Sequence, residues 1–364
     1  MPKEVRLVAP GRVELNSYQD RPPGPREVKV RLHYSAISHG TEMSHYRGHA
    51  IWHHKQVDPD GFVTEGQSMS YPFTYGYEDV AEIVAIGDEV TGFEIGQVVG
   101  CCANHRETAF FSIDGMNRST DTYFLPLPEP HDGSYERYVF VALGTVALDG
   151  ILLASIRLGE SAVVVGQGVV GLLTLQLCKL SGADLVIAVD LMDSRLQVSR
   201  ALGADYVLNP RNGDVGQEVK NILGGTGADI CFDASGKSGG INLALHCGTP
   251  FPRVVALGMY DGPAEDLLLG EEFCRSAGQI LHSRSGGYRL APEFPTTEGL
   301  YHRKWDFVRV NKTIISLLHR GKLKVDDLIS HRFPLGKAAE AYDLIDQHSE
   351  KVTKVIFDLR SKFD

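Results

Sequence analysis

The feature that most constrains the fold is a glycine-rich turn in the middle of the chain, VVVGQGVVG, which contains Gly166, Gly168 and Gly171. The turn follows an apolar run typical of a buried strand and opens a segment with helical periodicity. There, the first glycine permits a tight turn, the second admits a pyrophosphate, and the third lets helix and strand pack closely. The helix N-terminus then offers free N–H groups to phosphates. The pattern predicts a dinucleotide-binding βαβ unit, although a purely structural turn can have the same spacing.

The sequence around this turn has the pattern of a parallel sheet covered by helices. Short apolar runs at 162–165, 185–189, 230–232 and 254–257 alternate with helical stretches, as expected for strands buried on both faces. We therefore predict a doubly wound domain over residues 147–289. Residues 1–146 are rich in strands and turns, with an irregular surface loop at 103–125, and residues 290–364 mix helices and strands. The predicted fold class is α/β with two domains.

The second predicted strand of the βαβ unit ends in Asp190, about 20 residues beyond the glycine-rich turn. A carboxylate there accepts hydrogen bonds from ribose hydroxyls and would repel a 2′-phosphate, so it favours NAD over NADP. The alternative is that Asp190 only caps the following helix. The predicted cofactor-binding residues, which include later strand ends and the nearest cation after Asp190, are Gly166, Gly168, Val169, Val170, Gly171, Asp190, Arg195, Ala234, Leu257 and Gly258.

Composition excludes several classes of protein. The formal net charge of the 364 residues is -10, so no global basic field favours nucleic acid as a partner. We find no uninterrupted apolar segment of the ~18 residues that a membrane-spanning helix needs, and no signal peptide. Six cysteines without a CxxC pair suit reduced thiols. We expect a cytoplasmic protein with no membrane partner.

Further motifs resemble those of the medium-chain dehydrogenase/reductase superfamily, which includes the zinc alcohol and polyol dehydrogenases. The segment AISHGTE at 36–42 resembles the family's segment ending Cys-Gly-Thr-Asp, YGYE at 75–78 resembles its Gly-His-Glu, and GSYERY at 133–138 resembles the element before its coenzyme domain. The resemblance implies a GroES-like catalytic domain made from residues 1–146 and 290–364, and an inserted Rossmann domain. It also implies a small-molecule substrate and a homodimer or tetramer.

The residues that would hold zinc differ from the family's pattern. By alignment of these motifs, His39 stands where Cys is usual, Tyr77 where His is usual, and Ala142 near the third ligand. Catalytic zinc needs three protein ligands, so we expect none. The four-cysteine loop of structural zinc is reduced to Cys101 and Cys102. The residues of the first two motifs also resemble those of a subgroup of the superfamily that includes the bacteriochlorophyllide dehydrogenases. A zinc enzyme with unusual ligands remains the alternative.

Alcohol oxidation requires a group that takes the hydroxyl proton as hydride leaves carbon, and zinc usually assists this in the superfamily. His39 is the candidate, because an unperturbed histidine has a pKa of ~6.5. Tyr77 could donate a hydrogen bond, though it would need nearby cations to act as a base. Glu42 and Glu78 could orient His39 and Tyr77 or carry protons outward. Thr41, from the same motif as Glu42, is a further candidate catalytic residue. The alternatives are that His39 only hydrogen-bonds within a buried turn, that Tyr77 only packs, and that Glu78 is a structural ion-pair partner.

A basic segment follows the first motif and contains His45, Arg47, His49, His53, His54 and Lys55. It would suit a polyhydroxylated or anionic substrate, although it could equally be a solvated loop. The sequence thus predicts an NAD(H)-dependent alcohol, polyol or sugar dehydrogenase that works without zinc. A zinc-free quinone or enoyl reductase and a catalytically silent NAD(H)-binding sensor remain open.

Overall fold

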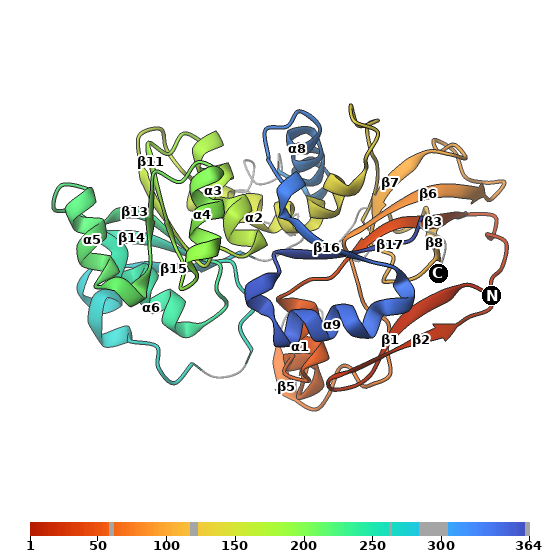
Figure 1. Ribbon diagram of the computed structural model, residues 1–364, viewed down its shortest axis with the longest axis horizontal. Helices are drawn as coiled ribbons and strands as arrows, with labels where there is room; N and C mark the ends of the chain where they lie inside the picture. The colour runs from red at the N-terminus through yellow and green to blue at the C-terminus, as the bar shows by residue number, and fades with distance from the viewer. Residues whose placement is uncertain (58–61, 117–122, 262–263, 284–304, 361–364) are drawn as a thin grey trace. The chain divides into compact units, whose positions relative to one another are not determined.

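The computed structural model describes residues 1–57, 62–116, 123–261, 264–283 and 305–360. The chain divides into two compact units, one of residues 1–142 and 325–364 and the other of residues 143–324 (Figure 1). The predicted boundary at 289/290 lies outside the described residues. Helix α8 (Phe307–His319) belongs to the second unit, whereas the family resemblance implied that it belongs to the catalytic domain.

The second unit is built on a six-stranded parallel sheet (Figure 1). Its strands are β10 (Ser161–Val165), β11 (Leu185–Val189), β12 (Tyr206–Leu208), β13 (Ala228–Asp233), β14 (Gly248–Ala256) and β15 (Gln279–His282). They lie in the order β12-β11-β10-β13-β14-β15. Numbered within the unit this is 3-2-1-4-5-6, the doubly wound order whose switch point falls between β10 and β13. The predicted Rossmann fold is confirmed, and β12 and β15 are strands that the pattern had not indicated.

Helices cover both faces of this sheet. Besides α8 they are α2 (Val141–Ala154), α3 (Val169–Leu180), α4 (Asp193–Ala201), α5 (Val215–Ile222) and α6 (Ser238–Cys247), with short turns at Pro210–Asn212 and Leu269–Phe273. Figure 1 shows α3 and α4 on one face and α5 and α6 on the other. Alternate residues of β10 and β11 pack against α5 and α6 in one apolar cluster that includes Val163, Ile187, Val219 and Ala244. Burial of apolar side chains on both faces thus explains the continuous apolar strands.

The first unit is built on a seven-stranded sheet with two small hairpins. The sheet contains β3 (Glu27–Ala36), β6 (Asp79–Ile86), β7 (Val98–Cys101), β8 (Thr108–Ser112), β9 (Phe124–Pro126), β16 (Ile329–Phe333) and β17 (Lys354–Asp358). The hairpins pair β1 (Lys3–Ala9) with β2 (Arg12–Ser17) and β4 (Lys55–Val57) with β5 (Val63–Glu65). Its helices are α1 (Thr41–Tyr46) and α9 (Ala338–Gln347), with short turns at Ile51–His53, Glu136–Phe140, Asp326–Leu328, Leu335–Lys337 and Ser349–Lys351. Strand β17 runs antiparallel to β3, with Ile356 opposite Ala36. Both ends of the chain therefore build one sheet, as the resemblance implied.

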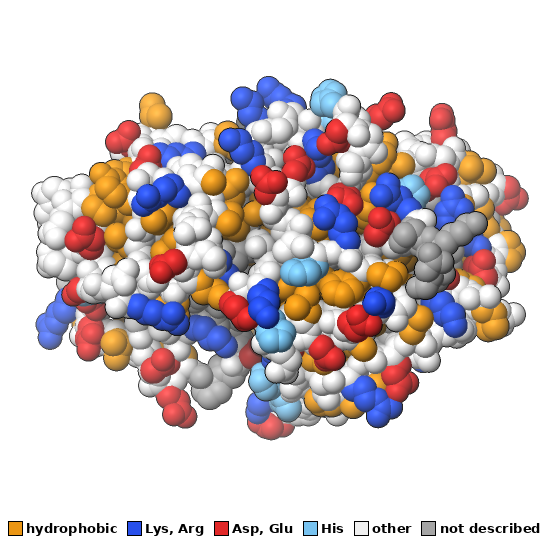
Figure 2. Space-filling model, in the orientation of Figure 1, with side chains coloured by type: hydrophobic (Ala, Val, Ile, Leu, Met, Phe, Trp, Pro, Cys, Tyr) orange, Lys and Arg blue, Asp and Glu red, His pale blue; other side chains and the backbone are white. Residues whose placement is uncertain are grey.

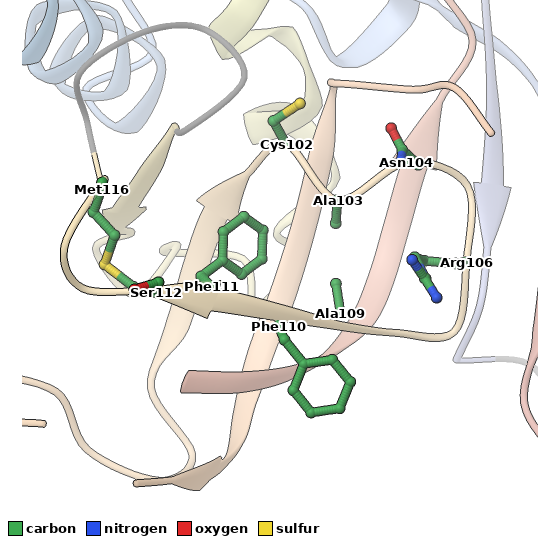
Figure 3. A pocket seen from close by; sticks show the side chains of 10 residues that line it. Cys102, Ala103, Asn104, Arg106, Ala109, Phe110, Phe111, Ser112 and Met116 are labelled. Atoms are coloured by element: carbon green, nitrogen blue, oxygen red, sulfur yellow. The ribbon is translucent and has the colours of Figure 1, made fainter. Parts of the chain in front are cut away.

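The prediction of an irregular loop at 103–125 was wrong over part of its length. Strand β8 pairs with β3, and β9 pairs with β7. In β8, Ala109 and Phe111 are buried while Phe110 points to the opposite side of the strand, as Figure 3 shows. This period of two is the mark of a half-buried strand, but the polar residues on either side of it obscured the pattern.

One helical stretch, Glu136–Ala154, is long and apolar enough to cross a membrane by length and composition alone, and 72% of its apolar window is buried inside the protein. That degree of burial is typical of a core helix.

Candidate active site

The glycine-rich turn forms a cradle between β10 and α3. Gly166 has a φ of +88°, and a Cβ there would lie 2.8 Å from the backbone nitrogen of Ser235. A Cβ on Gly171 would lie 1.8 Å from the carbonyl oxygen of Gly166. At Gly168, which precedes the first turn of α3, nothing lies within 4 Å of the Cβ position. Two glycines are therefore required for packing, and the third leaves open space above free N–H groups, which fits a dinucleotide pyrophosphate.

Asp190 joins the end of β11 to this cradle. Its carboxylate accepts hydrogen bonds from the backbone nitrogens of Gln167, at 2.7 Å, and Met192, at 2.9 Å. Helix α4 begins after Met192 and has no side-chain cap, so helix capping does not account for Asp190. A carboxylate has about four acceptor positions, so sites remain for a ribose hydroxyl. Arg195 lies 3.9 Å away in the first turn of α4.

The later strand ends pack against the same turn. Ala234 donates its backbone N–H to Val165 at 2.8 Å, and its Cβ is 3.6 Å from the Cβ position of Gly171. Gly258 lies so close to Gly236 that a Cβ would be 2.3 Å from its Cα. The side chain of Leu257 is buried against α2, so only its backbone remains for a cofactor contact. Val169 and Val170 form the first turn of α3.

In the first unit, the fold brings the two motif segments together. The AISHGTE segment connects β3 to α1, and YGYE leads into β6, which pairs with β3. Tyr77 donates its hydroxyl to Ser38 Oγ at 2.6 Å and also hydrogen-bonds Thr41. Burial and the neighbouring charge of Glu78 raise the pKa of Tyr77 well above 10. Tyr77 thus stays protonated and can donate, but it is not prepared to act as a base.

Glu78 forms a buried ion pair with Lys354 of β17. The Lys354 Nζ lies 2.5 Å from Glu78 Oε2 and 3.0 Å from the carbonyl oxygen of Ile37, and both charged side chains are fully buried. Burial raises the pKa of Glu78 to about 7, against the lowering effect of Lys354. The other carboxylate oxygen, Oε1, is buried and has no hydrogen-bond partner within the described parts of the chain. Glu78 is thus held in an ion pair, the contact that the structural interpretation expects.

Glu42 is also fully buried, in contact with a histidine that the sequence motifs did not identify. Its Oε1 lies 2.7 Å from His105 Nε2 and accepts the hydroxyl of Tyr342, and its Oε2 accepts the backbone N–H of Ser38 at 3.1 Å. Burial raises the pKa of Glu42, but the charge and hydrogen bond of His105, together with the hydrogen bonds from Tyr342 and Ser38, outweigh it and leave the pKa below its ordinary value. This arrangement suits an orienting role for Glu42.

The basic segment makes mostly internal contacts. His45 is buried, with its Nδ1 3.1 Å from His53 Nε2, and His54 lies 2.8 Å from the carbonyl oxygen of Gly48. Arg47 pairs with Asp346 of α9 at 2.7 Å. These contacts favour a structural role over an anion-binding one. Figure 2 likewise shows acidic and basic side chains interspersed over the visible face.

A separate hollow of about 310 Å³ lies beside β8 (Figure 3). It is lined by Cys102, Ala103, Asn104, Arg106, Ala109, Phe110, Phe111, Ser112, Gly115 and Met116. It contains none of the predicted catalytic or cofactor-binding residues, so we assign it no part in the chemistry.

The donor set of the first unit does not fit catalytic zinc. His39 is half-buried and is one candidate ligand. Tyr77 keeps its proton, Glu78 is held by Lys354, and Ala142 has no donor atom. Within the described parts of the chain, no three His, Cys, Asp or Glu side chains are grouped so that they could hold a metal ion.

Sequence reasoning missed the partners of the motif carboxylates. Lys354 gave a usable signal, because a lysine in the apolar strand KVIF is rarely buried unless it is paired. His105 and Tyr342 gave none, because each meets Glu42 only through tertiary structure.

Known proteins resemble the chain over nearly its full length. Residues 24–148 match the family described as alcohol dehydrogenase GroES-like domain, and residues 169–298 match zinc-binding dehydrogenase. D-guloside 3-dehydrogenase of Escherichia coli K12 is 29% identical, covering 97% of this chain and 99% of the relative. A zinc-binding dehydrogenase from Sinorhizobium meliloti bound to NADP has a TM-score of 0.75 at 18% identity, covering 98% and 99% of the two chains. An alcohol dehydrogenase from E. coli CFT073 complexed with NADH has a TM-score of 0.75 at 19% identity, with coverage of 98% and 99%.

Proposed function

Because the chain belongs to the medium-chain dehydrogenase/reductase superfamily of alcohol and polyol dehydrogenases, we propose that it is an NAD(H)-dependent oxidoreductase that interconverts a secondary alcohol and a ketone. The observation that carries the proposal is the open space above Gly168 at the start of α3. That space, next to two glycines that packing requires, suits the pyrophosphate of a nicotinamide dinucleotide. Solved relatives bound to NADP and to NADH support a nicotinamide cofactor.

The choice of NAD over NADP rests on Asp190. We expect Asp190→Ser to weaken NADH binding about 10–100-fold, because it removes a charged acceptor of ribose hydroxyls worth ~1.5–3 kcal/mol. It should also narrow the preference for NADH over NADPH. Fluorescence titration with both cofactors measures this.

Asp205→Ser is the matched control. Asp205 accepts the backbone N–H of Val186 at 2.6 Å. Its carboxylate therefore makes the same kind of hydrogen bond as that of Asp190, but to a residue near the start of β11. This variant should bind both cofactors as the wild type does. Tighter binding of NADPH than NADH by the wild type would contradict the assignment of NAD.

For the proton chemistry we assign His39 as general acid and base. The nicotinamide ring supplies hydride acceptance and donation when it is bound. Tyr77, held protonated beside Ser38, is available only as a hydrogen-bond donor, and Glu42 and Glu78 are engaged in buried ion pairs. His39 is the histidine of these motifs, and an imidazole ordinarily exchanges a proton near neutral pH. Glu78, whose pKa is raised to about 7, is tied to Lys354.

We expect chelator-washed protein to retain NAD+ reduction and His39→Ala to lose about 10²–10⁴-fold in kcat, the usual contribution of a general acid–base group. The measurement pairs elemental analysis with NADH formation over a panel of polyols, sugars and glycosides. The control is His33→Ala, because His33 lies on β3 and pairs with Glu82 at 3.1 Å, outside both motifs. Stoichiometric zinc with chelator-sensitive turnover would restore the zinc mechanism.

We propose a polyol, sugar or sugar-derived substrate. A relative aligned over 97% of this chain is named D-guloside 3-dehydrogenase, and that name supports a carbohydrate alcohol. The internal contacts of Arg47 and His54 give less support to an anionic substrate, so we rank uncharged glycosides and polyols first. We also propose that the protein is cytoplasmic and forms a homodimer or tetramer. Light scattering of the purified protein would measure the mass of the assembly and so test its oligomeric state.

The second candidate function is a catalytically silent NAD(H)-binding sensor. The observation in its favour is that Glu42 and Glu78 are both locked in ion pairs, which leaves few groups for catalysis. Tight NADH binding without turnover on the whole substrate panel would favour the sensor. A quinone or enoyl reductase is less well supported, because such enzymes commonly use NADPH and Asp190 opposes it.

A further inference from the structure

His105 is a fully buried imidazole that contacts both motif segments. Its Nε2 lies 2.7 Å from Glu42 Oε1, in the HGTE motif that carries His39. Its ring packs closely against Gly76, where a Cβ would be 2.9 Å from His105 Cε1, and its backbone N–H donates to the carbonyl oxygen of Tyr75 at 3.0 Å. One side chain therefore connects the segment of His39 to the segment of Tyr77.

The hydrogen bonds fix the protonation state of this imidazole. Ser35 donates its hydroxyl to Asp79 Oδ1, so its oxygen must accept from His105 Nδ1, 2.6 Å away. Glu42 is an acceptor, because Tyr342 and the backbone of Ser38 both donate to it. Both ring nitrogens must then carry protons whenever Asp79 and Glu42 are ionised. With both carboxylates ionised, the geometry favours an imidazolium that forms a buried ion pair with Glu42.

The surroundings of His105 support this charge. Burial lowers the pKa of His105, but Glu42, Asp79 and Glu78 outweigh it and leave the pKa raised. The carboxylates come from α1 and from the start of β6. Its aromatic neighbours are Tyr342 of α9, and Phe357 of β17 with its ring centroid 5.1 Å away. The charged groups with the largest effects on His105 are thus acidic.

A shared metal ion would normally tie two such segments together, because each segment would contribute a ligand. Here the donors at those positions do not fit zinc, yet the segments still need a fixed relative position for catalysis. A misplacement of 1 Å can lower a rate by about 100-fold. The Glu42–His105 pair provides a link of the same kind with protein groups alone.

We propose that His105 is a positioning residue of the active site, whose buried ion pair with Glu42 holds the turn of His39 against the segment of Tyr77 in place of a metal. It does not touch the substrate. The inference rests on the proposed function for the identity of the site, but the link itself can be measured without turnover.

The first test is a cycle of His105→Phe, Glu42→Gln and the double variant. His105→Phe leaves a buried, unpaired carboxylate, so we expect Tm to fall by roughly 10 °C. The double variant removes that charge and should regain most of the Tm. Its kcat should nevertheless stay about 10–100-fold below the wild type, while KM for NAD+ is unchanged. Recovery of kcat together with Tm would reduce His105 to a structural role and overturn the proposal.

The second test reads the position of His39 directly by NMR of ¹⁵N-histidine-labelled protein. His105 should show two protonated ring nitrogens at pH 7.5, and the resonance of His39 should shift in the double variant but not in His33→Phe. A neutral His105, or an unshifted His39, contradicts the proposal. If wild-type protein turns over no alcohol, the proposed function fails, and these spectra still decide whether His105 positions His39.

Discussion

Replacing Lys354 by Met lowers the free energy of unfolding by about 3–5 kcal/mol at pH 8, the usual effect of removing one partner of a buried ion pair. The methionine fills most of the space of the lysine stem but leaves Glu78 with an uncompensated charge. The hydrogen bond from Nζ to Ile37 is lost as well. Urea unfolding of the full chain measures the difference.

The effect should depend on pH in a defined direction. The folded-state pKa of Glu78 is already raised to about 7, and removing Lys354 takes away the charge that opposes this shift. A carboxyl whose pKa is raised on folding favours the folded state at low pH and loses that contribution as pH rises through the folded pKa. The loss at pH 5.5 should therefore be clearly smaller than at pH 8.

The double variant Glu78→Gln/Lys354→Met is the control, because it removes both charges. It should recover most of the lost stability at pH 8 and show little of the added pH dependence. A single variant as stable as the wild type at pH 8 would mean that the Glu78–Lys354 contact contributes nothing to folding.

Gly168→Ala should abolish detectable NADH binding while leaving the fold intact. Among the described residues the added methyl meets no atom within 4 Å, so the free energy of unfolding should change by no more than about 1 kcal/mol. It would occupy the space that we assign to the pyrophosphate. Fluorescence titration with NADH and thermal unfolding measure the two effects separately.

Gly171→Ala is the matched variant from the same turn. Its Cβ would lie 1.8 Å from the Gly166 carbonyl oxygen, so α3 must move away from β10, and both stability and NADH binding should fall. Unimpaired NADH binding by Gly168→Ala would place the pyrophosphate elsewhere.

The second unit could be predicted from sequence in most respects, because its signals are local. Apolar strands, the glycine spacing and Asp190 all lie within one βαβ unit. Strands β12 and β15 were missed because they are short edge strands with little continuous apolar pattern. The assignment of α8 depended on which unit its apolar face packs against, and periodicity alone does not determine that.

The candidate catalytic site was only partly predictable. Motif resemblance identified His39, Tyr77, Glu42 and Glu78, but the state of each depends on partners far along the chain. Lys354 is 276 residues from Glu78, and Tyr342 is 300 residues from Glu42. Such pairings arise from sheet register, so a single sequence does not show which carboxylate is neutralised.

The contribution of β17 to the sheet of the first unit has a consequence for how the protein matures. The ribosome must release residues 325–364 before β17 can pair with β3. Only then can Glu42 contact Tyr342 and Glu78 contact Lys354. The second unit, complete at residue 324, can fold earlier, because domains fold as units during synthesis. Nascent chains should therefore acquire the capacity to hold a dinucleotide before they acquire a finished catalytic centre.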